Sequence, residues 1–150
     1  MENYTLPQKI EKIITKIESL VPHYMENPID KTISEGNVAV CIMDEQGNVY
    51  GRLFGNDKIK SRRTYQIAWT KASQVWITGI STFSFEKQVF NGEIDDKIYG
   101  ISKPDFVGWE GGQPIVLKDG TKLSIGFSGF RGFVDVEIVV RALQMMDAEN

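Results

Sequence analysis

The feature that most constrains the fold is the apolar run VAVCIM at 38–43, which is followed by DEQGNVYGRLFG. Two runs rich in β-branched and aromatic residues flank the turn residues 44–48, a pattern typical of a β-hairpin. The first run is apolar at successive positions, so both faces of its strand should be covered. The sequence therefore predicts a central, buried strand paired with a neighbour.

A helix is predicted over 6–21. Thr5 and Gln8 have capping-box spacing and Pro7 falls in the first turn, while Pro22 should end the helix. The following segment, 23–36, has two helix breakers and no sustained period, and we expect a long connection there. The helix should bury one apolar stripe, which consists of Ile10, Ile13, Ile14, Ile17, Leu20 and Val21.

A second helix is predicted from Ser61 to about Gly79, and a shorter one, capped by Ser81 or Thr82, should end at Gly92. One broad apolar face of the longer helix contains Tyr65, Ala68, Trp69, Ala72, Val75 and Trp76.

A polar link, 93–106, leads into two further strands, QPIVL and KLSIGFSGF, which are joined by Lys118-Asp119-Gly120. A last helix after Gly132 should direct Val136, Val139, Val140 and Leu143 inward. Hairpins on both sides of a helical pair predict an antiparallel sheet with helices packed on it, an α+β fold rather than a doubly wound one. We expect one domain, 1–150.

The charge balance is close to neutral, with 17 basic and 20 acidic residues and a net charge of −3. This argues against general binding to nucleic acid or an anionic membrane. The first residues are amphipathic rather than signal-like, and no run is apolar over the ~18 residues of a membrane span. We expect a cytoplasmic protein.

Few residues are suited to hold a metal. Cys41 is the single cysteine and lies in the predicted buried strand, where it should act as a small apolar residue. His23 is the only histidine, so no site with two histidines can form within one chain. No phosphate-binding loop, dinucleotide fingerprint or serine-nucleophile motif is present. We therefore predict no metal site built from several side chains.

A basic run begins the second predicted helix. Positive charges there oppose the helix dipole, and a bound anion would convert that cost into a gain. The alternative is a solvated segment with counter-charges nearby. The run contains Lys58, Lys60, Arg62 and Arg63, and Lys71 follows about two turns later.

Two glycine-rich loops, GWEGG at 108–112 and GFSGFRG at 126–132, carry aromatic neighbours. Such loops bring backbone N–H groups close to a ligand and offer apolar walls. The alternative is turn geometry with aromatic packing at a subunit contact. The candidate ligand-binding residues in these loops are Trp109, Gly111, Gly112, Ser128 and Phe130.

The combined pattern resembles the GlcG-like and HbpS-like haem-binding or haem-degrading family, which includes the C-terminal domain of PduO-type adenosyltransferases. The resemblance runs over 37–143, through VAVCIMDEQGNVYGRLFG, the helix with Lys71-Ala72, KIYG, GWEGGQPIVLKDG and IGFSGFRGFVDVEIVVRAL. Its specific parts are the GG-x-P-[IL] loop, the Asp-Gly turn, the G-x-SG loop and the acid Asp135.

The resemblance implies a profilin-like fold, homodimers or higher homo-oligomers, and a small-molecule or haem-binding cleft. Haem is thus a candidate cofactor, with His23 as a candidate iron ligand. The unfavourable position of Arg62 and Arg63 on the helix dipole leads to a separate hypothesis, that they lie on the cleft rim and pair with an anionic group of the ligand. A second hypothesis is an enzyme acting on a small carboxylated metabolite through Glu110, Arg131 and Asp135. A third is a structural oligomer without a ligand.

Overall fold

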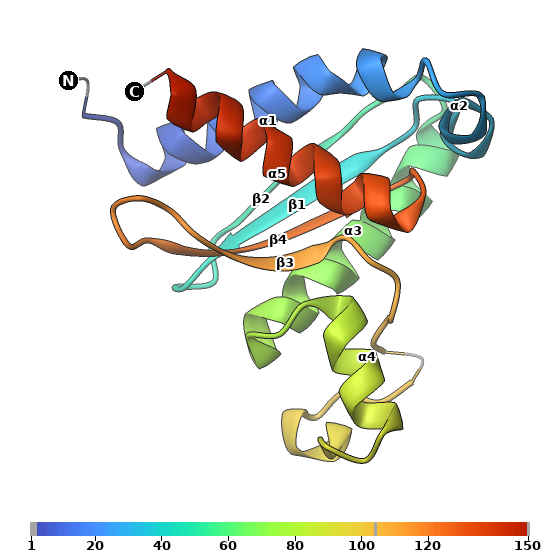
Figure 1. Cartoon of the computed structure of the whole chain (residues 1–150), viewed down its shortest axis with the longest axis vertical. Coiled ribbons are helices and arrows are strands. Elements are labelled where there is room, and N and C mark those ends of the chain that lie inside the picture. The colour runs from blue at the N-terminus through green and yellow to red at the C-terminus, as the bar shows by residue number, and fades with distance from the viewer. Residues whose placement is uncertain (1–2, 104, 150) are drawn as a thin grey trace.

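The computed structural model describes residues 3–103 and 105–149, which form an antiparallel sheet with helices on both faces (Figure 1). The strand order is β2-β1-β4-β3. The predicted α+β class is confirmed. The strands are β1 (Ala39–Asp44), β2 (Val49–Leu53), β3 (Gly112–Val116) and β4 (Lys122–Ser128).

The helices divide between the two faces of the sheet. α1 and α5 pack together over one face, and α3 crosses the other, with α4 beside it (Figure 1). Within the described part of the chain, no helix is long and apolar enough to span a membrane. The helices are α1 (Leu6–Tyr24), α2 (Pro28–Ser34), α3 (Lys58–Thr78), α4 (Thr82–Phe90) and α5 (Gly132–Ala148), and a 3-10 helix covers Asp96–Tyr99.

The predicted hairpin is present, and its first strand is the buried centre of the sheet. Every residue of β1 is buried, and β1 pairs with β2 on one side and β4 on the other. Val40 and Ile42 belong to the main core with α1 and α5, whereas Cys41 and Met43 face α3. Helices on both faces therefore explain the uninterrupted apolar run.

The predicted start of α1 is confirmed, but the predicted end is wrong. Thr5 and Gln8 form the capping box. Pro22 lies inside the helix, which continues to Tyr24. Because Pro22 is on the exposed side of the helix, the carbonyl that loses its N–H partner there can be hydrated.

The segment 23–36 was predicted to be a connection, and instead it contains α2. Asn27 caps this helix by accepting a hydrogen bond from the Ile29 N–H at 2.9 Å. Its apolar residues, Ile29 and Ile33, are about half exposed, and its buried residues are Asp30 and Ser34. A helix whose buried side chains are polar has no apolar stripe, so hydrophobic periodicity does not predict it.

α3 begins three residues earlier than predicted, because Asp57 caps it. The Asp57 carboxylate accepts hydrogen bonds from the N–H groups of Ile59 and Lys60. The basic run thus begins behind an acidic cap, which offsets its unfavourable position on the helix dipole. The predicted face is only partly buried: Ala68, Ala72 and Val75 are inside, Tyr65 is half-buried, and Trp69 and Trp76 are 48% and 46% exposed.

The face of α5 differs from the prediction as well. Val139 is buried as expected, but Val140 is 38% exposed, and Val136 and Leu143 are only half-buried. The predicted buried face was rotated about the helix axis relative to the observed one, because the charged Asp135 was not expected to be buried. The buried residues are Val134, Asp135, Ile138, Val139, Ala142 and Met146.

A row of small residues crosses the face of the sheet that meets α3. Gly51, Cys41, Gly126 and Gly112 are successive partners across the four strands. A Cβ added at Gly126 would overlap the Ala68 carbonyl oxygen and lie 2.7 Å from the Ala72 nitrogen. The helix backbone therefore rests almost directly on the sheet.

This close approach predicts that Gly126→Ala lowers the free energy of unfolding by about 3 kcal/mol, since neither backbone can yield easily. Urea denaturation measures the loss. Gly132→Ala is the matched control, because its new Cβ would meet only the flexible Glu110 side chain, at 3.3 Å. Equal stability of the two variants would show that α3 does not pack this closely.

Candidate functional site

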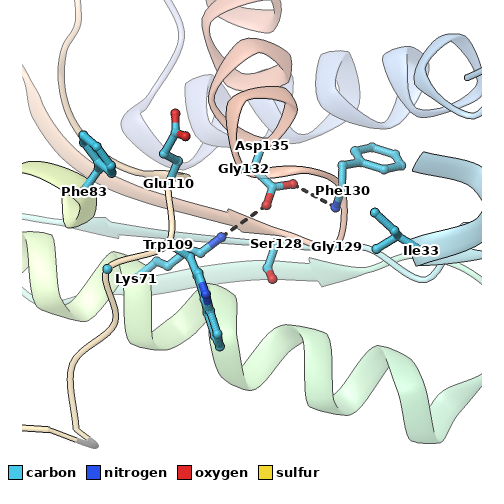
Figure 2. Close-up of a pocket in the computed structure, with 11 residues that line it drawn as sticks. Ile33, Lys71, Phe83, Trp109, Glu110, Ser128, Gly129, Phe130, Gly132 and Asp135 are labelled. Carbon is cyan, nitrogen blue, oxygen red and sulfur yellow. Dashed lines mark hydrogen bonds and ion pairs between the residues drawn. The ribbon is translucent and has the colours of Figure 1, made fainter. Parts of the chain in front are cut away.

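A cavity of about 530 Å3 lies where β4 ends and α5 begins. Five segments meet there, and aromatic side chains surround a buried ion pair (Figure 2). This size is within the range of pockets that hold small molecules. The lining residues are Ile33, Lys71, Phe83, Gly108, Trp109, Glu110, Ser128, Gly129, Phe130, Gly132 and Asp135.

The ion pair joins Lys71 of α3 to Asp135 of α5. Lys71 Nζ donates to the Phe127 carbonyl oxygen at 2.8 Å and to Asp135 Oδ2 at 3.3 Å. Asp135 Oδ1 accepts a hydrogen bond from the Phe130 N–H at 2.9 Å. Lys71 and Asp135 are only 1% and 3% exposed. The contact therefore closes the end of the sheet and fixes the turn that leads into α5.

Burial weakens the charged forms of both partners. It lowers the pKa of the Lys71 ammonium, against the opposing attraction of Asp135 and Glu110. It raises the pKa of Asp135 to about 7, although Lys71 and the Phe130 N–H act in the other direction. Desolvation thus perturbs both groups, and Asp135 can take up or release a proton near neutral pH.

Side chains from α3 and α4 hold the loop with Trp109 in place. Gln74 donates to the Val107 carbonyl oxygen at 3.0 Å and accepts from the Val107 N–H at 2.8 Å. Thr82 donates to the Trp109 carbonyl oxygen at 2.6 Å and accepts from the Gly112 N–H at 3.3 Å. The loop backbone is therefore fixed, while the Trp109 side chain is 63% exposed at the cavity mouth.

Gly111 explains why glycine is needed beside the ion pair. Its φ is +121°, and an added Cβ would lie 2.8 Å from Lys71 Nζ and 3.0 Å from Asp135 Cβ. Glycine therefore satisfies the backbone and leaves the space that the ammonium occupies.

The structure brings six of the candidate site residues together. Gly111 and Gly112 lie directly against the Lys71 side chain. Arg62 and Arg63 are exposed and do not line the cavity. They precede Lys71 by eight or nine residues, about 12–14 Å along a helix. The six that line the cavity are Lys71, Trp109, Glu110, Ser128, Phe130 and Asp135.

Two other candidates have structural partners elsewhere. Arg131 pairs with buried Asp30 of α2, with an Nη2–Oδ2 distance of 2.8 Å. His23 is exposed near the end of α1, and its ring contacts Tyr24, which in turn contacts Phe130. His23 is therefore separated from the cavity by two aromatic rings.

The chain matches the family model described as haem degrading protein HbpS-like over residues 27–144. The chain belongs to the HbpS-like family. Among curated proteins, no significant match is found.

Solved structures share the fold of this HbpS-like chain. A double mutant of HbpS from Streptomyces reticuli is 19% identical, with a TM-score of 0.60 and coverage of 97% of this chain and 88% of that one. The protein ORFY of Klebsiella pneumoniae is 15% identical, with a TM-score of 0.70 and coverage of 99% and 93%. A PduOC complex with haem is 15% identical, with a TM-score of 0.69 and coverage of 95% and 94%.

Several residues that line the cavity were not among the candidates named from the sequence. Phe83 and Ile33 were treated as parts of a short helix and a connection, and they are 55% and 48% exposed. An exposed apolar residue carries no sequence signal that separates a pocket wall from a surface. Ser81 is the N-cap of α4, and Thr82, the other predicted cap, is the first residue of the helix, where its hydroxyl bonds to the loop with Trp109.

A second groove, of about 610 Å3, lies beside the first and shares Phe83 with it. Phe90 and Phe106 give it apolar walls, and its charged residues are at least partly exposed, including the Lys103–Glu86 ion pair. It lacks a buried polar group of the kind that orients a ligand. The cavity at Lys71 is therefore the better candidate site.

The raised pKa of Asp135 predicts an unusual pH dependence of stability. Between its ordinary pKa of 3.8 and about 7, the folded chain holds a proton on Asp135 that the unfolded chain releases. Its contribution to the free energy of unfolding therefore falls as pH rises through this range, by at most about 1.4 kcal/mol per pH unit. Asp135→Asn should remove that fall, as measured by urea denaturation from pH 4 to pH 7.

Asp30→Asn is the control of opposite sign. Burial would raise the pKa of Asp30, but its hydrogen bonds with Arg131 outweigh this and lower it. Asp30 thus contributes stability above its ordinary pKa, and this contribution is lost in acid. A wild-type pH profile that Asp135→Asn leaves unchanged would contradict the assignment.

Proposed function

We propose that this protein binds a planar, anionic small molecule in the cavity at Lys71, with haem as the first candidate. The observation that carries the proposal is a buried ammonium at the base of a cavity with aromatic walls. Phe83 and Trp109, which are 55% and 63% exposed, offer ring faces to a flat apolar body, and the buried Phe130 forms part of the cavity wall. Lys71 and the start of α5 offer favourable charge to an acidic group. The family and a haem-bound structural neighbour support this choice.

The cavity fits the organic part of haem better than its iron. None of the lining residues is a histidine, cysteine or methionine, and His23 lies behind Tyr24. Among the described residues, no group of three or more His, Cys, Asp or Glu side chains is arranged to hold a metal ion. Affinity must therefore come from ring contacts and from the acidic groups, and we assign no step to the iron.

Haem and iron-free protoporphyrin should consequently bind with dissociation constants within about threefold of each other. Trp109→Ala should weaken both about tenfold, which corresponds to the ~1.4 kcal/mol of a lost aromatic contact. Quenching of tryptophan fluorescence and the Soret absorbance follow the titrations. His23→Ala is the control and should bind like wild type. Loss of the Soret change in His23→Ala, or failure of the iron-free ring to bind, would refute this mode of binding.

A second candidate function is catalysis on a small carboxylated metabolite. It is favoured by Asp135, whose pKa of about 7 suits proton transfer at neutral pH, beside Glu110 in the same cavity. We assign Arg131 no role in this candidate, because it does not line the cavity and its guanidinium pairs with Asp30.

We also propose that the protein is a cytoplasmic homo-oligomer that associates through the outer face of α3. Trp69, Trp76 and Ile77 are each more than 40% exposed there, and they line a hollow of about 520 Å3. The Trp76 indole donates to the Asp44 carbonyl oxygen at 2.9 Å. Because this bond already orders the ring, burying it against a second copy costs little side-chain entropy.

Replacement of both Trp69 and Trp76 by lysine should convert the oligomer into a monomer, since four buried charges would face one another in a pair. Sedimentation velocity distinguishes the species. Phe90→Lys, at an 89% exposed position on α4, is the matched control and should leave the assembly intact. An oligomer that survives the double substitution would place the contact elsewhere.

A further inference from the structure

Lys71 is unusual among the lysines of this chain. It is 1% exposed, whereas every other lysine is exposed or half-buried. A lysine removed from water shifts its proton equilibrium readily, and lysines of this kind serve as nucleophiles toward carbonyl compounds. The question is whether the surroundings of Nζ permit such chemistry.

The geometry leaves Nζ both held and approachable. Two acceptors, the Phe127 carbonyl oxygen and Asp135 Oδ2, occupy two of the three positions around the nitrogen. Gly111 has no side chain to cover it, and Lys71 lines the cavity, with Trp109 and Asp135 beside it in Figure 2. A group bound in the cavity can therefore approach the remaining position.

Imine formation also needs a group that can give a proton to the carbonyl oxygen and take one from the nitrogen, and Asp135 is that group. Burial lowers the pKa of Lys71 and raises that of Asp135 to about 7, so a carboxyl group able to give and take a proton near neutral pH lies next to an ammonium that holds its proton less tightly than usual. Glu110 also lines the cavity, and its negative charge acts on Lys71. The amine and an acid are thus 3.3 Å apart before any ligand arrives.

We propose that Lys71 forms an imine with the carbonyl group of a small aldehyde or 2-oxo acid bound in this cavity. The proposal rests on the binding role given above and adds a substrate class to it. The Lys71 nitrogen bonds to the carbonyl carbon, and the carbonyl oxygen takes the Asp135 proton. Asp135 then takes a proton from the nitrogen and returns it to the hydroxyl, which leaves as water. The C–O bond breaks as the nitrogen lone pair completes the C=N bond, so the products are a protonated imine, the Asp135 carboxylate and one water, and nothing is oxidised or reduced.

Reductive trapping tests this proposal. The full chain is incubated at pH 7.5 with 4-carboxybenzaldehyde, whose flat ring and carboxylate suit the cavity, and the imine is fixed with cyanoborohydride. Peptide mass mapping should find the adduct on Lys71 at least tenfold more often than on any other lysine. Surface lysines are only about 0.1% neutral at this pH, given an ordinary pKa of about 10.4. Labelling spread evenly over surface lysines, with Lys71 unmodified, would overturn the proposal.

A second ligand separates the failure of this inference from the failure of the binding role. Terephthalate resembles the aldehyde but has no reactive carbonyl, and its binding is followed with that of haem by tryptophan quenching. If either binds and Lys71 stays unlabelled, imine formation is refuted and the binding site stands. If neither binds and no adduct forms, both are refuted. An adduct on Lys71 in a protein that does not bind haem supports imine formation and excludes haem as the ligand.

Lys71→Arg is the matched variant, because it keeps a positive charge beside Asp135 but cannot form the imine. It should lose the specific adduct while the labelling of surface lysines is unchanged. The peptide map of the wild-type protein decides the question even where this variant fails to fold.

Discussion

The contact between Lys71 and Asp135 is the interaction on which the rest of the site depends. Its partners come from helices on opposite faces of the sheet, so one ion pair fastens three layers at the end of β4. Removing one partner of such a buried pair leaves an uncompensated charge and typically costs about 3–5 kcal/mol. An apolar pair could close the same gap. Retention of two ionisable groups at the base of a cavity therefore favours a role beyond packing.

Small residues in the sheet allow α3 to pack closely enough for Lys71 to reach the cavity. Gly126 lets the helix backbone rest against β4, and Gly112 gives the same freedom where β3 begins. The Lys71 side chain can then pass the edge of the sheet and end in the space left by Gly111. A Cβ at any of these positions would move the helix or the ammonium. Gly111, Gly112 and Gly126 thus act together, since they lie where the neighbouring strands β3 and β4 meet α3.

Much of the fold could be predicted from local signals, whereas the site could be predicted only in part. The hairpin, the Thr5 capping box and the antiparallel sheet follow from patterns that local physics enforces. α2 was missed because Asp30 and Ser34 point inward and its isoleucines outward, the reverse of the usual pattern. Lys71 and Asp135 were both candidates, but their pairing joins residues 64 positions apart. Arg62 and Arg63 were predicted to bind an anion because positive charge at a helix start is unfavourable. Asp57 offsets that charge, but it caps a helix that begins at Lys58, three residues before the predicted start.

Anion binding and imine formation make opposite demands on the same nitrogen. An acidic ligand is held best by the ammonium, whereas a carbonyl compound reacts only with the neutral amine. Because burial lowers the pKa of Lys71 and raises that of Asp135, a ligand that changes the charge in the cavity changes how strongly each partner holds a proton. A bound carboxylate close to Lys71 would draw the proton to the nitrogen, and an apolar carbonyl compound would leave it on Asp135. Under the two proposals, the ligand itself selects the protonation state, and one cavity would hold an acid reversibly and trap an aldehyde covalently.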